Sequence, residues 1–381
     1  MKAIHIIGIL ILAIIIIGGA AVLMGSTDNA NLVQPIKVGF IGPLTGDAAV
    51  YGLPAQNMVA LAVDEINAQG GVDGRRLEII YEDGKCSGAN SATAMQKLVN
   101  VDNVEVVLGG FCSSESLGAE PVATQNKVFL FSLGSSSPAL TGKSKFFARD
   151  YPSDATQGSV LAEVAYNDKA WRKVAFIQEQ LDYPLGVYNA FSSRFKELGG
   201  VVVKEEFAPG ITDFRSILTK LKAEDADALF IATQTPAAAD RILKQLTEIN
   251  WKPNILIADA ISGDPATVQA NAEILEGALA AEFGIDENNP KFRHMLDAYK
   301  NEYGSEPPYL SYAQIEYDGV YIIRDAIEAV GYDGEKVAEY VRNLDGWQGA
   351  SGSITIGQNG DRIGGHLPKV VRDGAVVLYS G

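Results

Sequence analysis

Val104-Glu-Val-Val-Leu108 is an apolar run of the kind that forms a buried strand, and it leads into Gly109-Gly-Phe-Cys-Ser-Ser-Glu-Ser116. A helical pattern follows from Glu115 to Gln125. The glycines let a ligand approach the backbone, and the serines place hydroxyls beside N–H groups that are free at a helix start. This chemistry suits a small carboxylate or another compact polar group, although a simple helix cap explains the same residues.

The same order of strand, turn and helix occurs on both sides of this stretch. Strands are expected at 36–41, 77–82 and 128–132, and helices at 51–69 and 92–100. The last of these strands leads into Gly134-Ser-Ser-Ser-Pro138, another turn of small residues. Strict alternation predicts a parallel, doubly wound α/β sheet, in which ligands bind outside the carboxyl ends of the strands. Tyr51, Ser113 and Ser136 are expected in loops at that edge.

The alternation starts again after residue 153. Strands are expected at 174–178, 201–206, 228–232, 255–258 and 279–283, and helices at 158–166, 185–198, 214–222 and 237–249. Three more helical patterns, at 290–303, 315–330 and 337–344, precede short strands at 353–356, 369–372 and 376–379. Two such α/β lobes with a cleft between them suit closure around a small ligand.

Composition and motifs exclude several classes of function. The 381 residues are 47% hydrophobic and 20% charged, as in an ordinary globular protein, and the formal charge of −16 argues against nucleic acid as a partner. No phosphate-binding or dinucleotide-binding glycine motif occurs. The three histidines stand in no catalytic or zinc-binding spacing, so we expect no enzyme, no catalytic residues, no metal site and no cofactor.

The first residues indicate export. Lys2 precedes an unbroken run of apolar residues and glycines, Ile6 to Met24, so residues 1–25 are either a cleaved signal peptide or a membrane anchor. Residues 26–35 then form a polar linker. The body is therefore expected outside the cytoplasmic membrane, in the periplasm or on the outer face of the cell. There the two cysteines, Cys86 and Cys112, favour a disulfide, whereas in the cytosol they would be thiols.

A family resemblance rests on motifs that run in order over nearly the whole exported part. They are Ile41-Gly-Pro-Leu-Thr-Gly46, Tyr51-Gly52, Asp64-Glu-Ile-Asn-Ala-Gln-Gly-Gly71, Cys112-Ser-Ser114, Asp154-Ala-Thr-Gln-Gly158, Asp213-Phe214, Glu276-Gly277, Tyr317-Asp-Gly319 and Asn359-Gly-Asp361. In these motifs the chain resembles the leucine/isoleucine/valine-binding protein family, the type I periplasmic solute-binding proteins of ABC transporters.

The resemblance implies a type I periplasmic-binding-protein fold. Two doubly wound parallel-sheet lobes would be joined by three crossovers, near residues 151–155, 282–285 and 362–366. Lobe 1 would comprise residues 36–153 plus 284–364, and lobe 2 residues 154–283 plus 365–381. Cys86 and Cys112 would form the single disulfide of the first lobe.

The resemblance also implies the ligand contacts. The hydroxyl and N–H of Ser113 would hold an α-carboxylate, and the Gly134 carbonyl would receive an α-ammonium. The remaining implied contacts are the Ser135–Ser136 turn with its Ser136 hydroxyl, Tyr51 and Phe111 on the first-lobe side, Tyr183 closing from the second lobe, and Tyr312. Tyr312 is equally explained as a packing residue at a helix start.

Two positions depart from the family pattern. The second tyrosine of the family falls near Gln234, where no aromatic residue stands, and the acidic partner of the ammonium group falls on Ala260. Asp259, one residue earlier, is expected to take over that role, with Asp182 and Glu282 as alternatives. If none of these carboxylates reaches the ammonium group, an α-amino acid loses its main countercharge.

The expected function is that of an extracytoplasmic solute-binding receptor. It would capture an amino acid, branched-chain or similar, or a related small carboxylate by hinge closure and deliver it to an ABC permease. The alternative is a ligand-sensing receptor of the same fold that signals to a membrane partner. An uncleaved N-terminal segment would add a membrane contact. The sequence leaves the ligand and the oligomeric state open.

Overall fold

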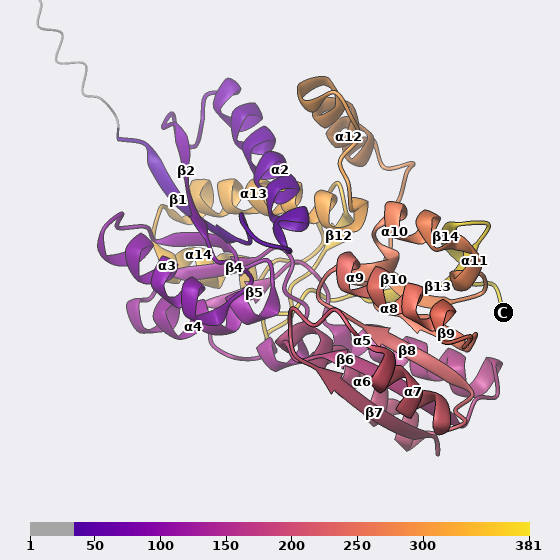
Figure 1. Ribbon diagram of the computed structural model, residues 1–381. Coiled ribbons are helices and arrows are strands. Elements are labelled where there is room, and N and C mark those ends of the chain that lie inside the picture. The colour runs from indigo at the N-terminus through magenta and orange to yellow at the C-terminus, as the bar shows by residue number, and fades with distance from the viewer. Residues whose placement is uncertain (1–33) are drawn as a thin grey trace, which may run out of the picture. The chain divides into compact units, whose positions relative to one another are not determined.

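Two mainly parallel sheets organise residues 34–381, the part of the chain that the computed structural model describes (Figure 1). The predicted signal peptide or anchor at 1–25 and most of the linker 26–35 lie outside the described residues. From Gln34 onward, no helix has both the length and the apolar composition that crossing a bilayer requires.

The first sheet has the strand order β2-β1-β3-β4-β5, and all its strands are parallel. Its strands are β1 (Ile36–Gly42), β2 (Leu77–Asp83), β3 (Val106–Gly109), β4 (Phe129–Ser132) and β5 (Phe147–Arg149). Its connecting helices are α2 (Ala49–Ala68), α3 (Gly88–Asn100) and α4 (Ser113–Asn126). Every residue of β3 and β4 is buried, because helices cover both faces of a parallel sheet.

The second sheet has the order β14-β13-β10-β9-β8-β6-β7. Its strands are β6 (Lys173–Glu179), β7 (Val201–Phe207), β8 (Ala228–Ala232), β9 (Asn254–Ile257), β10 (Leu279–Phe283), β13 (His366–Arg372) and β14 (Ala375–Leu378). The helices α5 (Asp154–Glu163), α6 (Asp182–Glu197), α7 (Arg215–Ala223) and α8 (Pro236–Glu248) connect the parallel strands. β13 is antiparallel to β10, and β14 to β13.

The segment between β10 and β13 returns to the first sheet. It contains α12 (Pro290–Tyr303), α13 (Leu310–Val330), α14 (Gly334–Arg342) and the hairpin of β11 (Trp347–Gly349) and β12 (Gly352–Ile354). The Tyr317 and Tyr321 hydroxyls of α13 donate to Glu65 of α2. The chain therefore passes between the two sheets three times, which confirms the predicted fold class. Residues 36–381 form one compact unit, so the proposed lobe boundaries stay a prediction.

Several predicted elements differ from the observed ones. α5 begins at Asp154 instead of 158, because the Ser153 hydroxyl accepts from the Ala155 N–H and caps the helix there. α13 begins at Leu310 instead of 315. Three short helices had not been predicted: α9 (Asp259–Ser262), α10 (Pro265–Ala270) and α11 (Ala272–Leu275). The three-residue strands β5 and β11 had not been predicted either.

The disulfide between Cys86 and Cys112 joins the loop after β2 to the start of α4, as the resemblance implied. The two cysteines are 26 residues apart in sequence. Replacing both with serine is expected to lower the free energy of unfolding by about 3 kcal/mol, because the bridge restricts the unfolded chain. Urea unfolding of both proteins measures this. A reductant should destabilise the wild type alone, and equal stability of the oxidised and reduced wild type would contradict the prediction.

Candidate functional site

The carboxyl edge of the first sheet carries two loops that serine side chains hold together. Gly109 ends β3 with φ at 120°, and a Cβ atom there would lie 2.1 Å from a backbone oxygen of β1, so only glycine fits. The next carbonyl, that of Gly110, accepts hydrogen bonds from Ser116 (3.2 Å), Ser132 (2.8 Å) and Ser135 (2.8 Å). The loop after β3 is thereby fixed to the loop after β4.

Glu115 organises the start of α4. Its buried carboxylate accepts from the N–H groups of Phe111 (3.0 Å), Cys112 (3.0 Å) and Cys86 (2.9 Å). Burial raises the pKa of Glu115 to about 7. The sequence-based interpretation did not assign Glu115 a role, although an acid three residues after the helix cap is a known signal. The N–H groups of Phe111 and Cys112, just before α4, therefore bond to Glu115 and are not available to a ligand.

Eight of the ten predicted ligand residues line one small cavity. They are Tyr51, Phe111, Ser113, Gly134, Ser136, Tyr183, Gln234 and Tyr312, and Cys112 and Ala260 complete the wall. The free volume is about 20 Å³, room for about one water molecule. The prediction that Tyr51 and Ser113 lie in loops is wrong, because Tyr51 is in the first turn of α2 and Ser113 is the first residue of α4.

The two other predicted residues lie outside the wall. The Ser135 hydroxyl donates to Gly110 and lies 2.7 Å from the Ser116 hydroxyl, so it holds the loops. Asp259 directly precedes Ala260 in sequence. Its buried carboxylate accepts from the hydroxyls of two wall residues, Tyr183 and Tyr312. Whether Ser135 and Asp259 act on a ligand stays a prediction.

Asp259 is the centre of a tyrosine cluster. The Tyr151 hydroxyl donates to its Oδ2 atom at 2.6 Å, and the Tyr312 hydroxyl donates to the same atom at 3.3 Å. Burial, and next the charge of Asp259, raise the pKa of Tyr151, Tyr183 and Tyr312 well above the usual value. These hydroxyls therefore stay neutral donors at physiological pH. The sequence had not indicated Tyr151.

Aromatic side chains of α2, α13 and the loop after β3 pack against one another at the cavity. Tyr51 stacks on Phe111 with ring centres 5.5 Å apart, and Tyr312 meets the edge of Phe111 at 5.2 Å. The Tyr51 hydroxyl donates to the Ala260 carbonyl at 2.9 Å, so α2 beside the first sheet is bonded to α9 beside the second. The wall is thus shared by both halves of the fold.

Polar atoms of the wall offer both donors and acceptors. The Ser113 hydroxyl accepts from the Ser137 N–H at 3.1 Å, which leaves its own hydrogen to donate. The Gln234 side-chain oxygen is buried and has no hydrogen-bond partner among the described residues. A small zwitterion or amide could use both groups.

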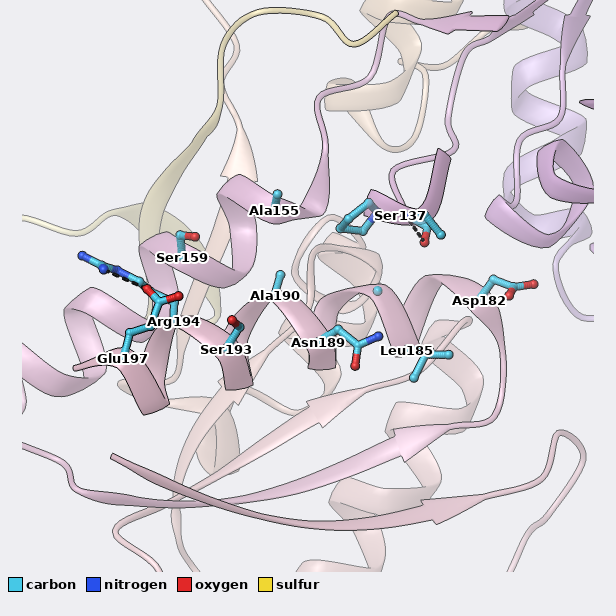
Figure 2. Close-up of a pocket in the computed structure, with 13 residues that line it drawn as sticks. Ser137, Ala155, Ser159, Asp182, Leu185, Asn189, Ala190, Ser193, Arg194 and Glu197 are labelled. Carbon is cyan, nitrogen blue, oxygen red and sulfur yellow. Dashed lines mark hydrogen bonds and ion pairs between the residues drawn. The ribbon is translucent and has the colours of Figure 1, made fainter. Parts of the chain in front are cut away.

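The two alternative carboxylates do not reach this cavity. Asp182 starts α6 and lies along a groove of about 400 Å³ between α5, α6 and the Ser137–Pro138 turn (Figure 2). Glu282 lines another groove, of about 490 Å³, together with Lys369. Burial raises the pKa of Glu282 to about 7. Of the three carboxylates predicted for the ammonium group, Asp259 is therefore the one that contacts the cavity wall.

Comparison with known proteins gives one consistent result. The sequence profile of the periplasmic binding proteins matches residues 35–367. The leucine-, isoleucine-, valine-, threonine- and alanine-binding protein of Pseudomonas aeruginosa is 26% identical over 348 residues, which cover 90% of this chain and 91% of that protein.

Two solved structures extend the comparison. A leucine-binding protein from Thermotoga maritima matches with a TM-score of 0.82 and 29% identity over 91% of this chain and 98% of that one. The branched-chain amino acid transporter substrate-binding protein of Streptococcus pneumoniae, solved with isoleucine, matches with a TM-score of 0.79 and 26% identity. That match covers 91% of this chain and all of the other. These relatives are solute-binding proteins.

Proposed function

Because this chain belongs to the periplasmic binding protein family, we propose that it captures an amino acid, branched-chain or similar, or a related small carboxylate outside the cytoplasm. The lobes close around the ligand, and the loaded protein delivers it to an ABC permease. The names of the relatives support this ligand class. The observation that carries the proposal is the cavity, since residues from both halves of the fold bring complementary polar groups to one point.

The polar groups suggest how a ligand lies. Its carboxylate would accept from the Ser113 hydroxyl at the start of α4, where the helix dipole also favours negative charge. Its ammonium group would donate to the Gly134 carbonyl and to the Gln234 side-chain oxygen, near the charge of Asp259. The rings of Tyr51, Phe111 and Tyr312 would enclose the side chain.

Closure would couple binding to delivery. A ligand that contacts both halves of the cavity binds the closed arrangement more tightly than an open one, and so shifts the population toward closure. The small free volume means that a ligand displaces the wall when it enters. Side-chain rearrangement or separation of the lobes would provide that space.

Calorimetry and thermal shift test the proposal. We expect at least one ligand among amino acids, amides, and aliphatic and aromatic acids to bind at one site per chain and raise the melting temperature. The matching amino alcohol, which lacks the carboxylate, serves as the control and should bind far more weakly. If no compound of these classes binds, the proposed function is wrong.

Replacing Ser113 with alanine is expected to weaken ligand binding by about 1–3 kcal/mol, the typical cost of losing a hydrogen bond to a charged group. Titration calorimetry with the ligand found above measures this. Ser114→Ala is the matched control, because Ser114 is buried next to Ser113 but does not line the cavity. An unchanged dissociation constant with lowered stability would show that Ser113 only supports the Ser137 N–H.

A further inference from the structure

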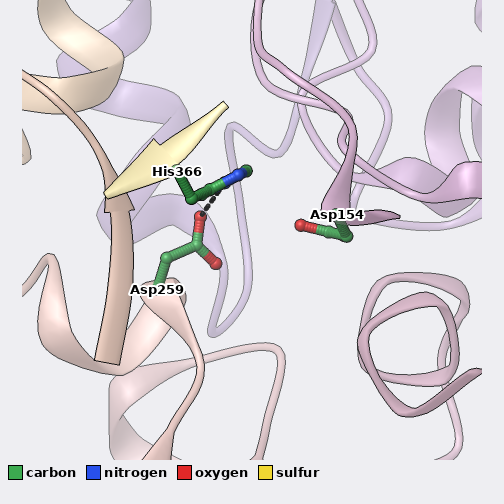
Figure 3. Close-up of side chains that lie close together, drawn as sticks. All are labelled: Asp154, Asp259 and His366. Carbon is green, nitrogen blue, oxygen red and sulfur yellow. Dashed lines mark ion pairs between the residues drawn. The ribbon is translucent and has the colours of Figure 1, made fainter. Parts of the chain in front are cut away.

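Three buried side chains behind the cavity direct acceptor atoms toward one another (Figure 3). Asp154, Asp259 and His366 are 0%, 2% and 4% exposed, and one ligand atom of each lies within 4.8 Å of the others. They stand at the starts of α5, α9 and β13, respectively. Three distant parts of the chain therefore meet at one point.

The hydrogen bonds of His366 determine which ring nitrogen carries the proton. The Thr156 hydroxyl donates to the Ser153 carbonyl at 2.9 Å, so it accepts from the Nδ1–H of His366 at 2.7 Å. The Nε2 atom of His366 then presents a lone pair to the cluster.

Two acceptor atoms of the cluster have no hydrogen-bond partner among the described residues. His366 Nε2 lies 4.0 Å from Asp259 Oδ2, and it has no hydrogen-bond partner among the described residues. The same holds for Asp154 Oδ1, whereas Asp154 Oδ2 accepts from the Ser136 hydroxyl at 2.7 Å. Buried acceptors that face each other are unfavourable unless a cation or a donor lies between them.

We propose that Asp154, Asp259 and His366 bind one divalent transition-metal ion, with Zn²⁺ as the representative. An imidazole nitrogen and two carboxylate oxygens suit such ions, and two carboxylates balance the charge of +2. Zinc–ligand bonds of about 2.0–2.2 Å would draw the three atoms closer together than they now lie. Thr156 on His366 and Ser136 on Asp154 supply the outer contacts that orient metal ligands.

The position of the site indicates what the ion would do. Asp154 and His366 flank the first and third passages of the chain between the sheets, and Asp259 belongs to the helix that Tyr51 contacts. An ion there would tie these passages together and stabilise the hinge. The site shares Asp259 with the proposed ammonium contact, but its assembly and its test need no bound amino acid.

Metal titration of the full chain tests the site. Protein without a histidine tag is stripped with EDTA, dialysed, and titrated with Zn²⁺ by calorimetry and with Co²⁺ by visible absorption. We expect one ion per chain and a higher melting temperature with Zn²⁺. His366→Gln and Asp154→Asn should each weaken Zn²⁺ binding by about 100-fold or more. His294→Gln is the matched control, because His294 is exposed and bonded to Glu65, and it should bind like the wild type.

Two outcomes would overturn the proposed metal site. One is that Zn²⁺ does not bind, and the other is that His366→Gln and the wild type bind it equally well. Circular dichroism of the metal-free variants verifies folding, and Asp154→Asn remains decisive if His366→Gln does not fold, since asparagine can still accept from Ser136. Amino-acid binding to the metal-free wild type is measured in parallel, so failure of the metal site is distinguishable from failure of the proposed function.

Discussion

Replacing Asp259 with asparagine is expected to weaken amino-acid binding by about 100-fold or more, because a buried ammonium loses its countercharge. Binding of the matching des-amino acid should change by less than about threefold, since that ligand has no ammonium, the asparagine oxygen can still accept from Tyr151 and Tyr312, and its NH2 group can donate to the Tyr183 oxygen. Calorimetry of both ligands against both proteins measures the difference. EDTA in every sample keeps metal ions out of the comparison.

Asp182→Asn is the matched control for this experiment. Asp182 is next to Tyr183 in sequence but lies along the groove of Figure 2, outside the cavity. Its substitution should leave both dissociation constants unchanged. If Asp259→Asn weakened the two ligands equally, Asp259 would act by holding the tyrosines in place and not by binding the ammonium group.

Replacing Arg149 with methionine is expected to lower the free energy of unfolding by about 3–5 kcal/mol, the usual cost of breaking a buried ion pair. The Arg149 side chain is fully buried, and its Nε atom donates to Asp361 at 2.8 Å. Its other nitrogens donate to the carbonyl of Ser137 at 2.8 Å and to the hydroxyl of Thr141 at 3.0 Å. The substitution therefore removes the ion partner of Asp361 and one donor from each of the buried Ser135 and Ser137 carbonyls.

Urea unfolding of Arg149→Met and of the matched control Arg215→Met tests this. Arg215 pairs with Glu248 at 2.8 Å on the surface, where an ion pair contributes less than about 1 kcal/mol. Equal losses in the two variants would show that the Arg149–Asp361 pair contributes no more than an exposed one. The loop after β4, which we propose contacts the ligand, should loosen in Arg149→Met as well, because Ser137 follows Ser136 directly.

The strands could be predicted closely where both faces of the sheet are covered. Residues 228–232 were predicted as a strand and form β8 at those bounds, because five consecutive buried residues leave no ambiguity of pattern. The helices α9 to α11 could not be predicted, since segments of four to six residues are too short to show a helical period. Asp259 therefore lacked a structural context in the sequence.

The cavity wall could be predicted from the family resemblance, but the partners behind it could not. Asp154 and His366 are 212 residues apart in sequence (366 minus 154), and no motif spans that distance. Tyr151 had no signal either, because an isolated tyrosine after a short strand looks like any packing residue. Only the topology, which brings the starts of α5, α9 and β13 together, reveals this cluster.

The pairing of β13 with β10 has a consequence for biosynthesis. A chain that is made and exported from its N-terminus completes β10 at Phe283, but the antiparallel neighbour begins only at His366. In between, the residues of α12, α13 and α14 emerge and dock on the first sheet. Throughout that interval β10 has an unpaired edge, the feature by which sheets aggregate or are held by chaperones. The nascent protein is therefore exposed to aggregation at this edge from the time Phe283 has emerged until the segment that begins at His366 has emerged.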